Sequence, residues 1–222
     1  MIPDLILCEK GFFVWEHILF DGIYGSITPE YFTKKKIIVS DCDGVLTNGN
    51  HIYNSEGKEY KVFGSCDKEA LRFMLKCGWQ VLFVTEDPTG VGITYARLDD
   101  WGGTHIHSPK NVLAVLKEGD GNFDIDFGYT YASPSQREEM ICLLKKVGYY
   151  VAYIGDSLSD THPGMAADAF CTPGNAIETA KNLSDRTCST SKIGGQGAFA
   201  DILYKLHYKV GTGNQGLGIF EA

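Results

Sequence analysis

The chain has 222 residues, 44% of them hydrophobic and 22% charged, which is enough to bury a sizeable core in an ordinary globular protein. Its net charge of −8, with only the short basic run at 34–36, argues against a nucleic-acid partner. No segment reaches the roughly 20 apolar residues of a membrane helix, so we expect no membrane partner. The seven cysteines include no C-x-x-C pair, which favours reduced thiols and a cytoplasmic location.

Composition divides the chain into three parts. Residues 1–35 form an N-terminal extension of unknown role, in which charged residues interrupt apolar patches. Residues 36–208 form one domain in which short apolar runs alternate with amphipathic stretches. Residues 209–222 are a glycine-rich C-terminal tail, and glycine favours a flexible segment.

From residue 36 onward, predicted strands and helices alternate. The strands are short apolar runs, and the helices begin at capping residues or repeat apolar residues at helical spacing. Ser133 to Gln136 carries an N-cap serine, a proline at the first helical position and a glutamine suited to a capping box. In chain order we predict a strand from Ile37 that ends at Asp41, a hairpin at 51–63, a helix that Asp67 caps and Gly78 closes, a strand at 81–84 followed by Thr85, a helix at about 88–100, a strand at 104–107, a helix from Ser108, a strand at 127–132, a helix from Ser133, a strand at 151–154 and a last helix that includes 199–206.

This alternation predicts an α/β fold, a Rossmann-like three-layer sandwich with a mostly parallel central sheet and a β-hairpin flap after the first strand. Three of the strands end in a polar side chain, namely Asp41, Thr85 and Asp156. Ligands of open parallel sheets bind outside the carboxyl ends of the strands. We therefore expect these three residues to meet at one site.

The run from Asp41 to Asp43 places two carboxylates two positions apart, so that along an extended chain they point the same way. One carboxylate can attack phosphorus, and the other can protonate the leaving oxygen and then activate water. Because two anions would repel a phosphate, the site needs a cation, and carboxylate oxygens suit Mg²⁺. Asp156 and Asp160 supply further carboxylates, and the Thr85 hydroxyl can donate a hydrogen bond to a phosphoryl group.

These residues resemble the signature of the haloacid dehalogenase superfamily of phosphatases. More narrowly, the chain resembles the capless branch that includes 3-deoxy-manno-octulosonate 8-phosphate phosphatase, in which a hairpin follows the first motif. The resemblance extends from about residue 36 to 206. It rests on Asp-Cys-Asp-Gly-Val-Leu-Thr at 41–47, Thr85, Gly-Asp-Ser-Leu-Ser-Asp at 155–160 and Gly-Gly-Gln-Gly-Ala at 194–198.

The resemblance implies Mg²⁺-dependent hydrolysis of a small phosphomonoester, such as a sugar phosphate or related metabolite, through an aspartyl-phosphate. It makes Asp41 the nucleophile and Asp43 the acid and then the base, and it gives Thr85 a role in binding the phosphoryl group. The metal would be held by Asp41, Asp43 through its main-chain carbonyl, Asp156 and Asp160. It further implies a homo-oligomer, expected to be a tetramer, whose hairpins pack against one another and cover the neighbouring sites.

Two residues compete for the role of the cation that neutralises the phosphoryl group. Arg137 opens the helix just before the strand of Asp156, and the segment 132–160 is similar to the hinge segment of P-type ATPases, where a lysine replaces Arg137. Lys110 opens the preceding helix and matches the octulosonate phosphatases better locally. Choosing Lys110 would make the following strand and helix an insertion. We favour Arg137 and leave both open.

Two departures from the family pattern concern the substrate. The branch usually has glycine and arginine after the second-motif threonine, where this chain has Glu86 and Asp87, and it usually has arginine at the position of Gln196. Both arginines would help to hold an anionic sugar acid, so we expect a less anionic substrate here. The alternative to an enzyme is a non-hydrolytic phosphoacceptor or scaffolding module with the same fold.

Overall fold

The computed structural model of the protein describes residues 34–112 and 125–211. Nearly all of the predicted extension over 1–35 and most of the predicted tail over 209–222 lie outside the described residues. Of the predicted tail, residues 209–211 are described, and they continue the last helix.

Among the described residues, six parallel strands form the central sheet. In chain order they are β1 (Lys36–Asp41), β4 (Trp79–Thr85), β5 (Thr104–His105), β6 (Phe127–Tyr131), β7 (Tyr150–Ile154) and β8 (Ala169–Cys171). Their order across the sheet is β5-β6-β4-β1-β7-β8. β1 therefore lies between β4 and β7, and the carboxyl ends of these three strands are adjacent. The predicted α/β sandwich with a parallel sheet is confirmed.

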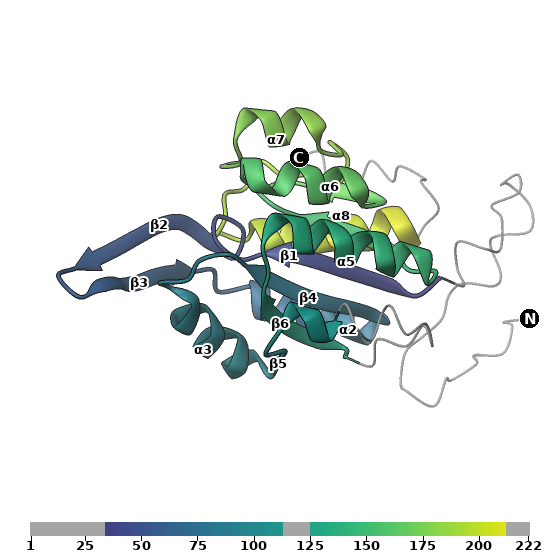
Figure 1. Ribbon diagram of the computed structural model, residues 1–222. Helices are drawn as coiled ribbons and strands as arrows, with labels where there is room; N and C mark the ends of the chain where they lie inside the picture. Colours follow the sequence, from purple (N-terminus) through teal and green to yellow (C-terminus); the bar gives the residue numbers. More distant parts are fainter. Residues whose placement is uncertain (1–33, 113–124, 212–222) are drawn as a thin grey trace, which may run out of the picture. The chain divides into compact units, whose positions relative to one another are not determined.

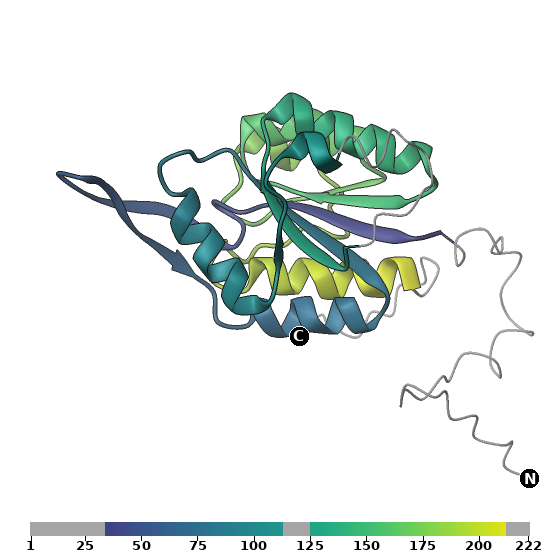
Figure 2. The same ribbon diagram turned by 60° about the horizontal axis from the view of Figure 1, so that its bottom comes forward.

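Helices cover both faces of this sheet (Figure 2). One face packs against α2 (Asp67–Lys76), α3 (Val91–Trp101) and α8 (Ala198–Gly211) in a core that includes Leu71, Leu98 and Phe199. The other packs against α5 (Pro134–Lys146) and α7 (Glu178–Leu183), with Met140 and Ala180 in its core. The short helices η1 (Leu158–Asp160) and α6 (Thr161–Ala166) follow β7. Among the described residues, no helix combines the length and the apolarity that a membrane crossing requires.

The predicted hairpin is a separate antiparallel pair, β2 (Thr47–Asn54) and β3 (Gly57–Phe63), which extends away from the sandwich in Figure 1. At its turn, the Asn54 side chain accepts hydrogen bonds from the main-chain N–H groups of Glu56 and Gly57. Gly57 has a φ of +132°, a value that favours glycine. The hairpin exposes Ile52 by 52% and Tyr60 by 56%, more apolar surface than an isolated ribbon usually leaves in water.

The start of α5 follows the sequence prediction, and the start of α2 does not. Ser133 caps α5 with the full capping box to Gln136. Cys66, not Asp67, is the N-cap of α2. Asp67 is instead fully buried, and its Oδ1 accepts a hydrogen bond from the main-chain N–H of Ala200 at 3.3 Å in the first turn of α8. The Asp67 side chain therefore serves a distant helix and does not cap its own.

Candidate active site

The polar strand ends converge on a pocket of about 610 Å³ at the carboxyl edge of the sheet. The lining combines the strand ends with the hairpin and with the loops after β4 and β7. It comprises Asp41, Asp43, Gly44, Gly49, His51, Tyr53, Lys58, Thr85, Glu86, Asp87, Thr89, Arg137, Asp156, Ser157 and Ser159. A second pocket, lined by residues between 172 and 191, contains none of the predicted site residues.

The loop after β1 is tightly wound around the main-chain carbonyl of Cys42, which accepts hydrogen bonds from the N–H groups of Leu46 and Thr47. This turn needs Gly44, whose φ is +83°. A Cβ atom at Gly44 would lie 1.9 Å from Oδ2 of Asp156. The glycine therefore allows the first aspartate loop to approach the carboxylate at the end of β7.

Arg137 supplies the cation at the buried end of the pocket. It lies in the first turn of α5, which the Ser133 cap fixes, and it is only 1% exposed. Its Nη1 is 3.1 Å from Oδ1 of Asp41 and 2.8 Å from Oδ1 of Asp160, and its Nε donates to the carbonyl of Ala132. Lys110 is exposed and does not line the pocket. The geometry thus brings Arg137, and not Lys110, to Asp41.

Asp160 organises the loop after β7. Its Oδ1 accepts hydrogen bonds from Arg137 at 2.8 Å and from the Tyr153 hydroxyl at 2.5 Å. Its Oδ2 accepts hydrogen bonds from the main-chain N–H groups of Asp156 and Ser157 and from the Ser157 hydroxyl. Because both oxygens are heavily bonded, Asp160 fixes the loop that presents Asp156 and orients the guanidinium that faces Asp41.

The three carboxylates of this region form a group that could hold a metal ion. Asp41, Asp156 and Asp160 each offer an oxygen, and the three oxygens lie within 4.8 Å of one another. Burial, together with the charges of the neighbouring carboxylates, raises the pKa of Asp41 well above its ordinary value, although Arg137 opposes this effect. Burial and the charge of Asp160 raise the pKa of Asp156 to about 7. The single guanidinium therefore leaves a surplus of negative charge, which suits a divalent cation with oxygen ligands.

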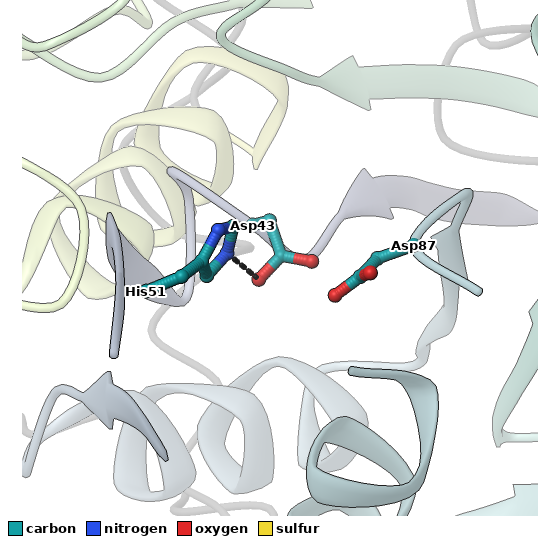
Figure 3. Close-up of side chains that lie close together, drawn as sticks. All are labelled: Asp43, His51 and Asp87. Carbon is teal, nitrogen blue, oxygen red and sulfur yellow. Dashed lines mark ion pairs between the residues drawn. The ribbon is translucent and has the colours of Figure 1, made fainter. Parts of the chain in front are cut away.

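Asp43 is held by the hairpin. Its Oδ2 is 2.8 Å from Nζ of Lys61, and its Oδ1 lies 3.5 Å from Nε2 of His51 and 3.4 Å from the Thr47 hydroxyl. Figure 3 shows Asp43 between His51 and Asp87. The side chains of the two aspartates and His51 form a second group with ligand atoms within 4.8 Å. The Lys61 ammonium, 2.8 Å from both Asp43 and Asp87, already supplies a cation there, so this group does not need a metal.

Asp87 is a partner for the hairpin lysines, which the sequence did not reveal. Its Oδ2 is 2.5 Å from Nζ of Lys58 and 2.8 Å from Nζ of Lys61. Although burial alone would raise the pKa of Asp87, the hydrogen bonds from the two lysines lower it well below its ordinary value. The main-chain N–H of Asp87 donates to the Thr85 hydroxyl oxygen at 3.3 Å. The sequence shows that Asp87 departs from the family pattern. It does not reveal the two lysine partners, which lie 26 to 29 positions earlier in the chain. Gln196, the other departure, is exposed and lies outside the pocket lining.

No protein-family model matches the chain. Among solved structures, it resembles the cobalt-bound deoxy-D-mannose-octulosonate 8-phosphate phosphatase of Haemophilus influenzae, with 21% identity over 87% of this chain and 96% of that one and a TM-score of 0.59.

A second structure, 3-deoxy-D-manno-octulosonate 8-phosphate phosphatase of Moraxella catarrhalis in complex with magnesium, phosphate and KDO, shares 24% identity over 85% of this chain and 95% of that one, with a TM-score of 0.61. The enzyme of the same name from Yersinia pestis shares 18% identity over 84% and 87%, with a TM-score of 0.55. The resemblance that the motifs predicted is thereby confirmed for the fold, and the reaction has to be argued from the residues of this site.

Proposed function

We propose that the protein is a phosphatase that hydrolyses a small phosphomonoester through an aspartyl-phosphate on Asp41. The observation that carries the proposal is the meeting of Asp41, Asp43, Arg137 and Asp156 in one pocket at the carboxyl ends of β1 and β7. Phosphoryl transfer asks a protein mainly for positioning and charge neutralisation. A buried carboxylate paired with a guanidinium at 3.1 Å, beside a second acid, meets both requirements.

In the proposed mechanism, a carboxylate oxygen of Asp41 attacks phosphorus while the bond from phosphorus to the leaving oxygen breaks. The electron pair of that bond goes to the leaving oxygen, which takes a proton from Asp43, and the alcohol departs. Asp43 then removes a proton from water, whose oxygen attacks the same phosphorus. The bond to Asp41 breaks and inorganic phosphate is released. Arg137 and Thr85 stabilise the charge on the phosphoryl oxygens throughout.

Mg²⁺ is the proposed metal, because the donor set consists of carboxylate oxygens in a region of surplus negative charge. Asp41 and Asp156 would hold it, with the main-chain carbonyl of Asp43, and Asp160 would complete or orient this set. When bound, the ion would neutralise the phosphate and allow it to approach the anionic nucleophile. The neighbours bound to magnesium or cobalt support this choice.

The substrate proposed here is a phosphorylated metabolite with a neutral or weakly anionic leaving group. Lys58 is paired with Asp87, and Arg137 is paired with Asp41 and Asp160, so the lining cations we can describe are already engaged. A sugar-acid carboxylate would find no unengaged arginine among the described lining residues. We therefore expect weak turnover of 3-deoxy-octulosonate 8-phosphate and better turnover of less anionic esters.

We also propose that the protein acts as a homotetramer in the cytoplasm. The exposed apolar side chains of the hairpin support self-association, since packing hairpins together would bury them. Free thiols at all six cysteines of the described residues agree with a reducing compartment.

The test is a panel of phosphorylated metabolites assayed with Mg²⁺ for wild type and for Asp41→Asn. We expect hydrolysis by wild type, and a loss of activity in the variant without a loss of folding by circular dichroism. Activity of Asp41→Asn near wild type would refute the nucleophile assignment. An acid-stable phosphorylated protein that never turns over would instead indicate the phosphoacceptor alternative.

A further inference from the structure

The hairpin places a lysine, Lys61, completely inside the protein beside the proposed acid. The side chain of Lys61 has no exposed surface, and its Nζ lies 2.8 Å from Oδ2 of Asp43, from Oδ2 of Asp87 and from the Thr94 hydroxyl. Burying an ammonium is costly unless it is paired and hydrogen-bonded. Here three oxygens from three different segments share it, so its position is closely defined.

A β-bulge makes this arrangement possible. Ile52 pairs with Tyr60, but the next residue, Tyr53, pairs with Lys58, so β3 carries one extra residue, Glu59. Residues three apart on a regular strand point to opposite faces. The extra residue lets Lys58 and Lys61 reach the same carboxylate of Asp87.

The side chains of the two lysines pack against Gly90. A Cβ atom there would lie 2.6 Å from Cδ of Lys58 and 2.6 Å from Cε of Lys61. The lysine stems therefore pack directly on the main chain that leads into α3. The hairpin is attached to the sandwich beside the proposed acid, and not only at its two ends.

We propose that Lys61 is a positioning residue that holds Asp43 for proton transfer, an inference that rests on the proposed phosphatase function. Lys61 contacts Oδ2 of Asp43 at 2.8 Å, whereas among the described residues Oδ1 has only the long contacts to Thr47 and His51 at 3.4 and 3.5 Å. Oδ1 is thus the oxygen that exchanges the proton, first with the leaving oxygen and then with water. Asp87 and Thr94 keep the ammonium in place.

Lys58 is a matched control, because it has the same chemistry, lies on the same strand and contacts the same Asp87. It also lies 5.9 Å from the ring centroid of Tyr53, but among the described residues it forms no ion pair with Asp43. If the lysines only attach the hairpin, removing either should have the same kind of effect. If Lys61 positions Asp43, only its removal should impair proton transfer.

The experiment compares kcat/KM for p-nitrophenyl phosphate, whose leaving group departs without a proton, with kcat/KM for glycerol phosphate, whose leaving group needs one. This ratio reports the steps up to release of the alcohol, so it isolates the acid role of Asp43 from the later hydrolysis. General acid–base catalysis is worth about 10²–10⁴-fold. For Lys61→Met we expect a loss of about 30-fold or more with glycerol phosphate and less than about 3-fold with the aryl ester. For Lys58→Met we expect the same factor on both.

Equal losses on both esters in Lys61→Met, or the selective loss in Lys58→Met as well, would overturn the inference while leaving the phosphatase intact. Hydrolysis of neither ester by wild type would overturn both proposals. Should Lys61→Met fail to fold by circular dichroism, Thr94→Val removes one oxygen that holds the ammonium while keeping the side-chain shape. A selective loss with glycerol phosphate in that variant supports the positioning role, and an equal change on both esters contradicts it.

Discussion

Replacing Arg137 with alanine should reduce phosphatase activity far more than replacing Lys110. Nη1 of Arg137 reaches Asp41 at 3.1 Å and Asp160 at 2.8 Å, both within a nearly solvent-free environment. Hydrogen bonds to charged groups contribute about 1.5–3 kcal/mol each. Losing the proposed contact to the phosphoryl group and the alignment of Asp41 should raise the transition-state free energy by about 3–4 kcal/mol, or lower kcat/KM by about 10²–10³-fold.

The same change should lower stability, because breaking a buried ion pair typically costs about 3–5 kcal/mol. Activity is therefore measured below the onset of unfolding, which urea titration locates for each variant. Arg137→Lys keeps the charge but cannot bond the Ala132 carbonyl and two carboxylates through one planar group, so we expect intermediate activity. Lys110→Ala, at an exposed helix start, should change kcat/KM by less than about 2-fold.

The reverse ranking, with Lys110→Ala nearly inactive and Arg137→Ala active, would refute this reasoning. It would mean that Lys110 serves the phosphoryl group and that the stretch 111–131 is an insertion. A folded Arg137→Ala variant with wild-type kcat/KM would show that the contacts of the guanidinium are structural alone.

Three further outcomes are expected. Gly44→Ala should abolish Mg²⁺-dependent activity and weaken Mg²⁺ binding by calorimetry, because its Cβ would lie 1.9 Å from Oδ2 of Asp156; normal binding would contradict the close approach. Burial raises the pKa of Asp67 to about 6, so the folded state retains a proton and stability falls as pH rises from about 4 to 6. By urea titration, the free energy of unfolding of Asp67→Asn should exceed that of wild type by about 2–3 kcal/mol at pH 8, with little difference near pH ~3.5. Replacing both Ile52 and Tyr60, which are 52% and 56% exposed, with serine should shift the proposed tetramer to smaller species in sedimentation. A wild-type monomer with full activity would exclude the assembly.

The hairpin also shows a limit of the sequence prediction. Phe63 falls within the hairpin predicted at 51–63, but in the fold it is partly buried and packs against the core of α2 and α8. The last residue of β3 already belongs to the sandwich. A variant that removes exposed apolar surface from the hairpin must therefore change residues nearer the turn.

The sequence by itself determined which segments form strands and helices, and which acids stand at the strand ends. Apolar runs, the capping box at Ser133 and the spacing of Asp41 and Asp43 are local features, and short-range propensity decides them. Because parallel strands present their carboxyl ends on one edge, Asp41, Thr85 and Asp156 could be assigned to one site without knowing a single contact.

Only the tertiary structure decided which cation faces Asp41 and what holds Asp43. Arg137 reaches the site because β6 pairs with β4, and that strand order brings the start of α5 over β1 and β7. Lys58 and Lys61 reach the same carboxylate of Asp87 because one extra residue in β3 shifts the register of the hairpin. Strand order and register are set by the packing of segments far apart in the chain, and a shift of one residue turns a side chain to the opposite face. Local sequence patterns therefore could not reveal these contacts.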